Sequence, residues 1–335
     1  MFDPALNALL QTFSRPVLDG FFIAVTAAGY GVVLAVILSA LYWTWDRRRA
    51  FVLIQFILYS GLINHALKEW FQMPRPFQVA PDAVRVLDPV MRLEICEGGI
   101  AWAVPAKTSY GFPSGHAQIA VCLWGALALH WRRRGATIAA TALVLLIAFS
   151  RLYLGVHFLG DVLGGLAVGG LLLAAYAMAR EVESHGDRSP SGPFLILLGG
   201  LLPLVFLVSA PDVSTARRVG LLLGVTVGFM FDRLAAKESA VIRRSPVQRA
   251  ACAALGVLVI GGLGYLLREV RQRFDADHQA FDPIVFALTS CLLVGFAVPV
   301  WRVGFHAFVA LAADRKPPRA GRPLRRAVHS DSASE

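Results

Sequence analysis

Polar side chains able to hold an anion gather in three short motifs of an otherwise apolar sequence. The first motif is KEWFQMPRP, residues 68–76, where an apolar run ends. Lys68 and Arg75 could simply extend to the lipid headgroups from this position. However, Pro74 and Pro76 flank Arg75 and favour extended backbone, which would aim the guanidinium at one fixed point. The motif therefore indicates either two membrane-anchoring cations or two cations that bind an anionic ligand.

The second motif is PSGH, residues 113–116, where a polar loop meets the next apolar run. Ser114 is a good N-cap residue, and the backbone N–H groups of Gly115 and His116 would be unpaired donors at the positive end of a helix dipole. Such a helix start can bind an anion. A single histidine near a helix start is more often structural than catalytic, so this tetrapeptide alone does not decide the function.

The third motif is SRLYLGVHFLGD, residues 150–161. His157 and Asp161 are four residues apart, so on a helix they share a face and the carboxylate can accept a proton from the imidazole. Gly155 supplies a break that would let Arg151 end one helix while His157 begins the next. Charged groups near hydrocarbon are costly and usually functional. The alternative is a structural ion pair between Arg151 and Asp161.

The elements that must position these motifs are membrane helices. The chain has 335 residues, of which 56% are hydrophobic, and its mean hydropathy is +0.60. These values exclude a soluble protein of ordinary composition and predict an all-α integral membrane protein. About nine apolar runs could cross a bilayer as helices. They lie at residues 18–43, 51–67, 117–131, 136–154, 158–179, 193–210, 217–231, 249–267 and 283–311.

The chain divides into four predicted regions. Residues 1–16 form an amphipathic helix in the membrane interface, with Phe2, Leu6, Leu9, Leu10 and Phe13 on one face. Residues 17–180 form the catalytic transmembrane core. A polar stretch rich in turn formers then introduces a four-span region, residues 181–313. Residues 314–335 form a basic, disordered tail.

The distribution of basic residues predicts the orientation in the membrane. The net charge is +10, but the basic residues are concentrated in loops and in the tail, which favours membrane topology over nucleic-acid binding. By the positive-inside rule these loops are cytoplasmic, so the amino terminus lies outside and the carboxyl terminus inside. The chain does not cross between the first two motifs and crosses twice between the second and third. All three motifs therefore face the same outer surface.

The assembled set of side chains suits a tetrahedral oxyanion with three negative oxygens. His157, with Asp161 fixing its tautomer, is suited to attack phosphorus. His116 is suited to protonate the leaving oxygen and later to activate water. No group of Asp, Glu, His or Cys has metal-ligand spacing, so no cofactor is expected. The anion would meet the three cations Lys68, Arg75 and Arg151 and the N–H donors of Gly115 and His116 at the helix start.

These motifs resemble, position by position, those of the type 2 phosphatidic acid phosphatase superfamily. The shared patterns are K-x6-RP at residues 68–76, PSGH at 113–116 and SR-x5-H-x3-D at 150–161. The resemblance implies a helical bundle, a phosphohistidine intermediate on His157, His116 as acid and base, and Asp161 orienting His157. It further implies a phosphate held by Lys68, Arg75, Ser114, Gly115 and Arg151. It covers roughly residues 17–180, and the nine-span layout is similar to that of glucose-6-phosphatase.

The leading interpretation is a metal-independent phosphatase of the bacterial inner membrane with its active site on the periplasmic side. Its substrate would be a phosphate monoester or pyrophosphate of a phospholipid or isoprenoid lipid. A sugar-phosphate phosphatase and a lipid phosphotransferase remain alternatives, and a lipid transporter fits less well. The expected partners are this substrate and membrane lipids, without nucleic acid, and the oligomeric state is not predicted. Asn64 and His65 are interpreted as helix-packing groups.

Overall fold

Every regular element is helical in the part of the chain that the computed structural model describes, as the sequence predicts. The described residues are 1–44, 46–89, 110–184, 197–209 and 212–236, with the single positions 254 and 262. By length and composition, three helices could cross a membrane, within Arg48–Val79, Arg134–Tyr153 and Leu159–Arg180. The predicted run 283–311 lies outside the described residues, and of the run 249–267 only positions 254 and 262 are described, so the nine-span count stays a prediction.

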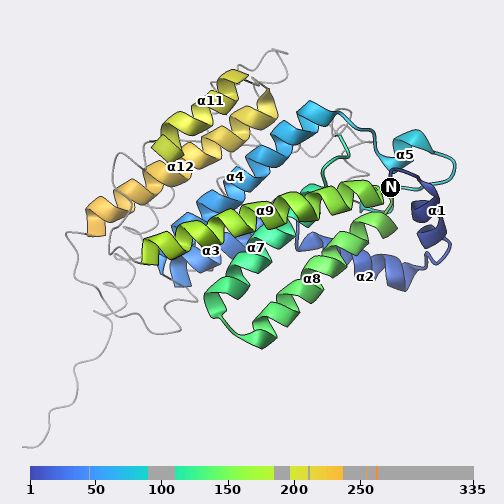
Figure 1. Cartoon of the computed structure of the whole chain (residues 1–335), viewed down its shortest axis with the longest axis horizontal. Helices are drawn as coiled ribbons and strands as arrows, with labels where there is room; N and C mark the ends of the chain where they lie inside the picture. Colours follow the sequence, from blue (N-terminus) through green and yellow to red (C-terminus); the bar gives the residue numbers. More distant parts are fainter. Residues whose placement is uncertain are drawn as a thin grey trace, which may run out of the picture.

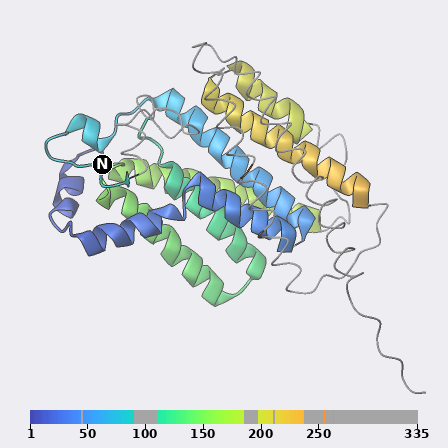
Figure 2. The same cartoon turned by 180° about the vertical axis from the view of Figure 1, so that it is seen from behind.

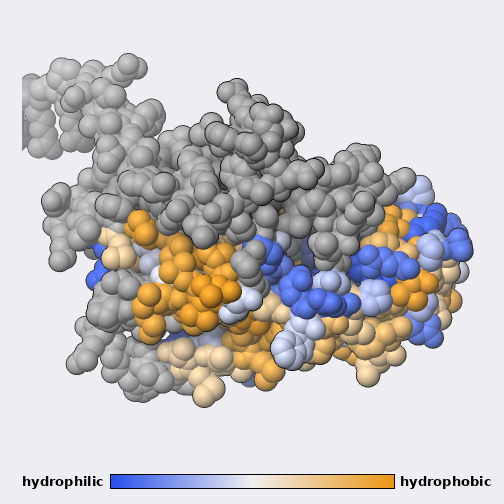
Figure 3. Space-filling view, turned by 90° about the horizontal axis from the view of Figure 1, so that it is seen from above, coloured by the Kyte–Doolittle hydropathy of each residue, from blue (hydrophilic) through white to orange (hydrophobic). Residues whose placement is uncertain are grey.

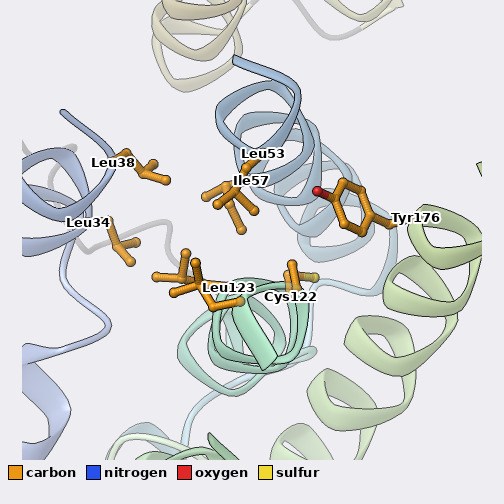
Figure 4. Packing of buried hydrophobic residues seen from close by; sticks show 9 residues of the cluster. Leu34, Leu38, Leu53, Ile57, Cys122, Leu123 and Tyr176 are labelled. Atoms are coloured by element: carbon orange, nitrogen blue, oxygen red, sulfur yellow. The ribbon is translucent and has the colours of Figure 1, made fainter. Parts of the chain in front are cut away.

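The central bundle consists of α3 (Gly31–Thr44), α4 (Arg47–Phe71), α7 (Gly115–Trp131), α8 (Arg134–Tyr153) and α9 (Leu159–Ser184). In Figure 1, α4 and α9 run in opposite chain directions, and α7 and α8 form an antiparallel pair. Buried apolar side chains of four helices meet between them (Figure 4), among them Leu34, Leu38, Leu53, Ile57, Cys122, Leu123 and Tyr176. Apolar side chains also cover much of the described surface in Figure 3, as contact with lipid requires.

Local sequence signals set the ends of these helices. Asp46 caps α4 by accepting a hydrogen bond from the backbone N–H of Arg49 at 2.8 Å. Gln72 ends α4, and Arg132 ends α7, each in the left-handed conformation that commonly terminates a helix. Short turns follow both residues, so α7 and α8 pack as neighbours.

The predicted run 18–43 is wrong as a single helix, because the chain forms α2 (Pro16–Ala27) and then α3. The N–H groups of Gly29 and Tyr30 bond to carbonyls three residues earlier, which tightens and ends α2. The break between α2 and α3 allows contacts with distant parts of the chain. A Cβ at Gly29 would lie 2.5 Å from the ring of His116, and the Tyr30 hydroxyl donates to Asp88. These contacts cannot be predicted from a hydropathy pattern.

The amino-terminal helix is shorter than the predicted region 1–16, since α1 spans Ala5–Gln11. Leu9 and Phe13 are exposed, whereas Asn7 and Gln11 are the buried residues of α1. The polar side chains of α1 thus face the protein. Its placement in the membrane interface stays a prediction.

In the described part of the chain, the polar stretch is followed by η2 (Leu197–Leu201), α11 (Leu202–Ser209) and α12 (Val213–Ala236). Of these, α12 packs on α4, and η2 and α11 pack on α12. Phe229 of α12 stacks on Phe51 with ring centroids 3.9 Å apart, and Gln55 donates to Thr226 at 2.6 Å. Figures 1 and 2 both show α12 alongside α4.

Glycines let α9 approach α7 closely, as the sequence LGGLAVGG suggests. An added Cβ at Gly169 would lie 2.8 Å from the carbonyl oxygen of Gln118, whereas one at Gly170 would meet nothing within 4 Å. Neighbouring glycines of one helix therefore differ only in whether α7 lies against them.

We expect Gly169→Ala to lower the thermal midpoint of the protein in detergent, because overpacking costs about 1–3 kcal/mol. Gly170→Ala is the matched control and should leave the midpoint unchanged or raise it, since alanine favours the helix by about 0.5–1 kcal/mol. Equal midpoints for the two variants would contradict this packing.

Candidate active site

The first and second motifs lie side by side at the end of α4. After Gln72 the chain passes through Arg75 into the short helix α5 (Pro76–Val79). The Gly111 N–H donates to the carbonyl oxygen of Met73 at 2.7 Å, and the Lys68 ammonium donates to the carbonyl oxygen of Tyr110. Lys68 is thereby held beside the loop that leads into PSGH.

The second motif is joined to the third by the backbone. The Ser114 N–H donates to the carbonyl oxygen of Asp161 at 2.9 Å. A Cβ at Gly165 would lie 2.4 Å from the carbonyl oxygen of Ser114, so α9 touches the start of α7. The shared location that topology predicted for the three motifs is thus present in the fold.

His157 lies in the connection between α8 and α9, two residues before α9 begins. The predicted break is present, because α8 ends at Tyr153 and Gly155 has φ of 74°. A Cβ at Gly155 would also lie 2.4 Å from the carbonyl oxygen of Arg85. Glycine is therefore required both by the backbone conformation and by space.

The His157 ring is held between a carboxylate and a guanidinium. Its Nδ1 lies 3.3 Å from Oδ2 of Asp161, and its Nε2 lies 3.4 Å from a terminal nitrogen of Arg75. Oδ2 of Asp161 also accepts the Phe158 N–H at 2.9 Å, which fixes the carboxylate. Donation from Nδ1 to Asp161 leaves the Nε2 lone pair directed toward the cationic side of the site.

The environment keeps His157 neutral. Burial lowers the pKa of its imidazole well below the ordinary value, and the positive charges of Arg75 and Lys68 lower the pKa further. A neutral imidazole whose Nε2 carries no proton can act as a nucleophile.

Arg151 is fully buried, and its ion-pair partner is Asp88 rather than Asp161. Its guanidinium donates to Oδ2 of Asp88 at 2.8 Å and to the hydroxyl of Thr26. The other oxygen of Asp88 accepts from Tyr30. The alternative of an Arg151–Asp161 pair is therefore wrong. Sequence reasoning missed Asp88, whose only signal is a lone carboxylate between Leu87 and Pro89.

His116 is linked to the same pair through Tyr30. The two rings meet edge to face, with centroids 5.2 Å apart and an interplanar angle of 89°. The Tyr30 hydroxyl therefore contacts the partner of Arg151 while its ring positions His116.

Several buried polar atoms around this site have no hydrogen-bond partner among the described residues. They are Ser114 Oγ, His116 Nε2, Arg151 Nε and Asp161 Oδ1. Ser114 occupies the N-cap position of α7 as predicted, but its side chain makes no capping bond. Unpaired buried polar groups are costly, so a concentration of them points to a ligand that pairs with them.

Two polar residues of α4, Asn64 and His65, bond to neighbouring segments. Asn64 donates to the carbonyl oxygen of Pro113 at 3.2 Å and to Gln118 at 2.9 Å, so it fastens the PSGH turn to α4. His65 instead pairs with Asp212, with Nε2 3.0 Å from Oδ2. The His65 contact joins α4 to the start of α12, which agrees with the packing interpretation, whereas Asn64 contacts a motif of the site. Among the described residues, no group of three or more His, Cys, Asp or Glu side chains could hold a metal ion.

Comparison with known proteins identifies similar sequences. Residues 49–185 match the PAP2 superfamily. Phosphatidylglycerophosphatase B of Bacillus subtilis is 28% identical over 188 residues, which cover 51% of this chain and 79% of that protein. Lipid A 4'-phosphatase of Porphyromonas gingivalis is 30% identical over 197 residues, covering 55% and 78%. The solved transmembrane PAP2 type phosphatidylglycerolphosphate phosphatase from Bacillus subtilis is 25% identical, with 55% and 87% covered and a TM-score of 0.41.

Asp88→Ala should destabilise the protein by about 3 kcal/mol, because it leaves the buried guanidinium of Arg151 without its carboxylate partner. The thermal midpoint in detergent measures this loss. Asp82→Ala, an exposed carboxylate of the same segment, is the matched control and should leave the midpoint unchanged. Equal midpoints for the two variants would show that the Asp88 pair contributes nothing to stability.

Proposed function

The chain belongs to the PAP2 superfamily of phosphatases, and on that premise we propose that it is a lipid phosphate phosphatase acting through a phosphohistidine on His157. The observation that carries the proposal is the placement of the His157 ring between Asp161 and Arg75, at 3.3 and 3.4 Å. This arrangement orients a neutral nucleophile toward the side of the site where an anion would bind.

The charge balance of the site favours a phosphate. Lys68, Arg75 and Arg151 contribute three positive charges, and Asp88 and Asp161 contribute two negative charges. With His157 neutral and His116 carrying the proton that it donates, two positive charges remain, which a phosphate dianion would neutralise. Fixed cations and helix-start N–H groups stabilise the charge that spreads over the oxygens of a phosphoryl group in transfer.

The reaction has two displacements. In the first, Nε2 of His157 forms a bond to phosphorus as the bond to the leaving oxygen breaks, and His116 donates a proton to that oxygen. Asp161 accepts the Nδ1 hydrogen bond and stabilises the positive charge that develops on the ring. In the second, His116 removes a proton from water, the water oxygen bonds to phosphorus, and the phosphorus–nitrogen bond breaks.

The proposed phosphate ligands are those that the motifs predict. Lys68, Arg75 and Arg151 supply cationic donors, and Ser114 and Gly115 supply the start of α7. The unpaired hydroxyl of Ser114 and Nε of Arg151 support this assignment. Asp88 holds Arg151 in place, so a phosphate would meet an already ordered guanidinium.

We further propose a phosphorylated lipid as substrate and a periplasmic active site in the bacterial inner membrane. The names of the relatives support the lipid, since they are phosphatases of phosphatidylglycerophosphate and of lipid A. The basic loops support the orientation, with the carboxyl terminus in the cytoplasm. We also propose that the chain divides into four regions, residues 1–16, 17–180, 181–313 and 314–335.

The pH dependence tests the state of His157. Because the pKa of His157 is lowered and its neutral form attacks, the loss of activity on the acidic side should come as pH falls through that lowered value. The acidic limb of kcat/KM, which reports the free enzyme, should therefore lie below about pH 6.5.

A control distinguishes His157 from the ionisation of the substrate. Arg75→Gln removes one of the charges that lower the pKa of His157, so the acidic limb should shift upward. The ionisation of the substrate would not move with this substitution. An acidic limb that stays in place would contradict the assignment of the limb to His157.

Phosphate release across a substrate panel tests the proposed function. Purified protein in detergent should hydrolyse phosphatidic acid, phosphatidylglycerol phosphate or undecaprenyl pyrophosphate in preference to glucose 6-phosphate, and EDTA should not reduce the rate. His157→Ala should lower the rate by roughly 10³-fold.

His130→Ala is the matched control for this panel, because His130 bonds to Tyr176 at 2.9 Å and lies near the opposite end of α7. A preference for glucose 6-phosphate would count against a lipid substrate. Full activity in His157→Ala would exclude His157 as the nucleophile.

A further inference from the structure

The amino-terminal residues 1–30 precede the segment 49–185 that matches the family, yet they contact residues of the second and third motifs. Figures 1 and 2 both show α1 and α2 beside the ends of α8 and α9. Thr26 bonds to Arg151, and Tyr30 contacts His116. A further contact of this kind comes from Asn7, which is 1% exposed.

Asn7 bonds to the segment that carries His157. Its amide nitrogen donates to the carbonyl oxygen of Leu152 at 2.8 Å and to the carbonyl oxygen of His157 at 3.0 Å. One NH₂ group thus spans the chain break at Gly155, from the last turn of α8 to His157. A break of this kind leaves the last carbonyls of a helix in need of donors, and here a distant side chain supplies them.

We propose that Asn7 is a positioning residue for His157. The Asp161 carboxylate fixes the His157 ring, and the Asn7 amide fixes the backbone from which the ring extends. Both constraints are needed, because a nucleophile displaced by about 1 Å can lose roughly 10²-fold in rate. The expected effect on catalysis rests on the proposed function, whereas the hydrogen bonds of Asn7 do not depend on it.

Gln11 provides an internal control from the same helix. It lies one turn after Asn7 and is also buried, and its amide nitrogen donates to the carbonyl oxygens of Arg85 and Tyr153 at 2.7 and 3.3 Å. It therefore resembles Asn7 in burial and in hydrogen bonding, but it does not bond to His157. A purely structural role predicts similar effects for the two residues, whereas a positioning role predicts an effect on His157 for Asn7 alone.

The first arm of the test compares Asn7→Leu with Gln11→Met, which nearly conserve volume and remove the buried donors. With phosphatidic acid in detergent micelles, Asn7→Leu should lower kcat by roughly 10- to 100-fold. KM should change little, because the phosphate ligands are untouched. Gln11→Met should lower kcat far less at a similar loss of thermal midpoint. Equal kcat losses would overturn the inference.

The second arm needs no activity. Carbethoxylation of His157 by diethyl pyrocarbonate, followed by peptide mass spectrometry, should be severalfold faster in Asn7→Leu than in the unchanged protein, because a released segment exposes the ring. Gln11→Met should leave the rate unchanged. If Asn7→Leu does not fold, Asn7→Ser, whose hydroxyl keeps one donor, should give a smaller increase in rate.

The two arms separate the two proposals. If the protein hydrolyses none of the lipid phosphates but Asn7→Leu alone accelerates modification of His157, the proposed function fails and the positioning role stands. If activity depends on His157 but the Asn7 and Gln11 variants behave alike in both arms, the function stands and the positioning role is excluded.

Discussion

Holding charged side chains at one end of an apolar helix bundle is the constraint on which the rest of the structure depends. Arg75, Arg151, Asp88 and Asp161 are almost completely buried there. Unpaired charges in such surroundings would be strongly destabilising, so each must have a partner before any ligand binds. Asp88 provides one for Arg151, and the connection at Gly155 brings His157 between Asp161 and Arg75.

This requirement explains why the bundle is irregular near the site. The chain interrupts what could have been one long helix at residues 28–30, and there Gly29 makes space for His116 while Tyr30 reaches Asp88. A second interruption lies at Gly155, where side chains of α1 donate to the carbonyl oxygens of Leu152 and Tyr153. Regular helices pack with one another elsewhere, and the breaks occur where polar groups must converge. The site is therefore built by two chain interruptions and by an amino-terminal layer that covers them.

The sequence predicted well whatever depends on short spacing or on membrane topology. The four-residue separation of His157 and Asp161 anticipated their contact, and the glycine at position 155 anticipated the end of α8. Counting crossings between motifs placed Lys68 and Ser114 at one end of the bundle. Such inferences work because helical periodicity and the thickness of the bilayer are local rules.

The sequence could not predict contacts between distant segments. Asn7 and His157 are 150 positions apart, and Asp88 and Arg151 are 63 apart. Nothing about a single carboxylate or amide indicates which distant backbone it meets. The apolar face of α1 suggested a helix in the membrane interface, but the polar residues Asn7 and Gln11 are the ones buried against the protein. The family resemblance, which covers roughly residues 17–180, likewise gave no information about Asn7.

The most direct test of the account is to trap the covalent intermediate. Purified protein in detergent would be mixed with phosphatidic acid carrying a radiolabelled phosphate, quenched with alkali within milliseconds and digested for peptide analysis. The account predicts an acid-labile, alkali-stable label on the peptide that contains His157, and no such label in His157→Ala. Rapid phosphate release without a labelled peptide, or a label on any other residue, would contradict it.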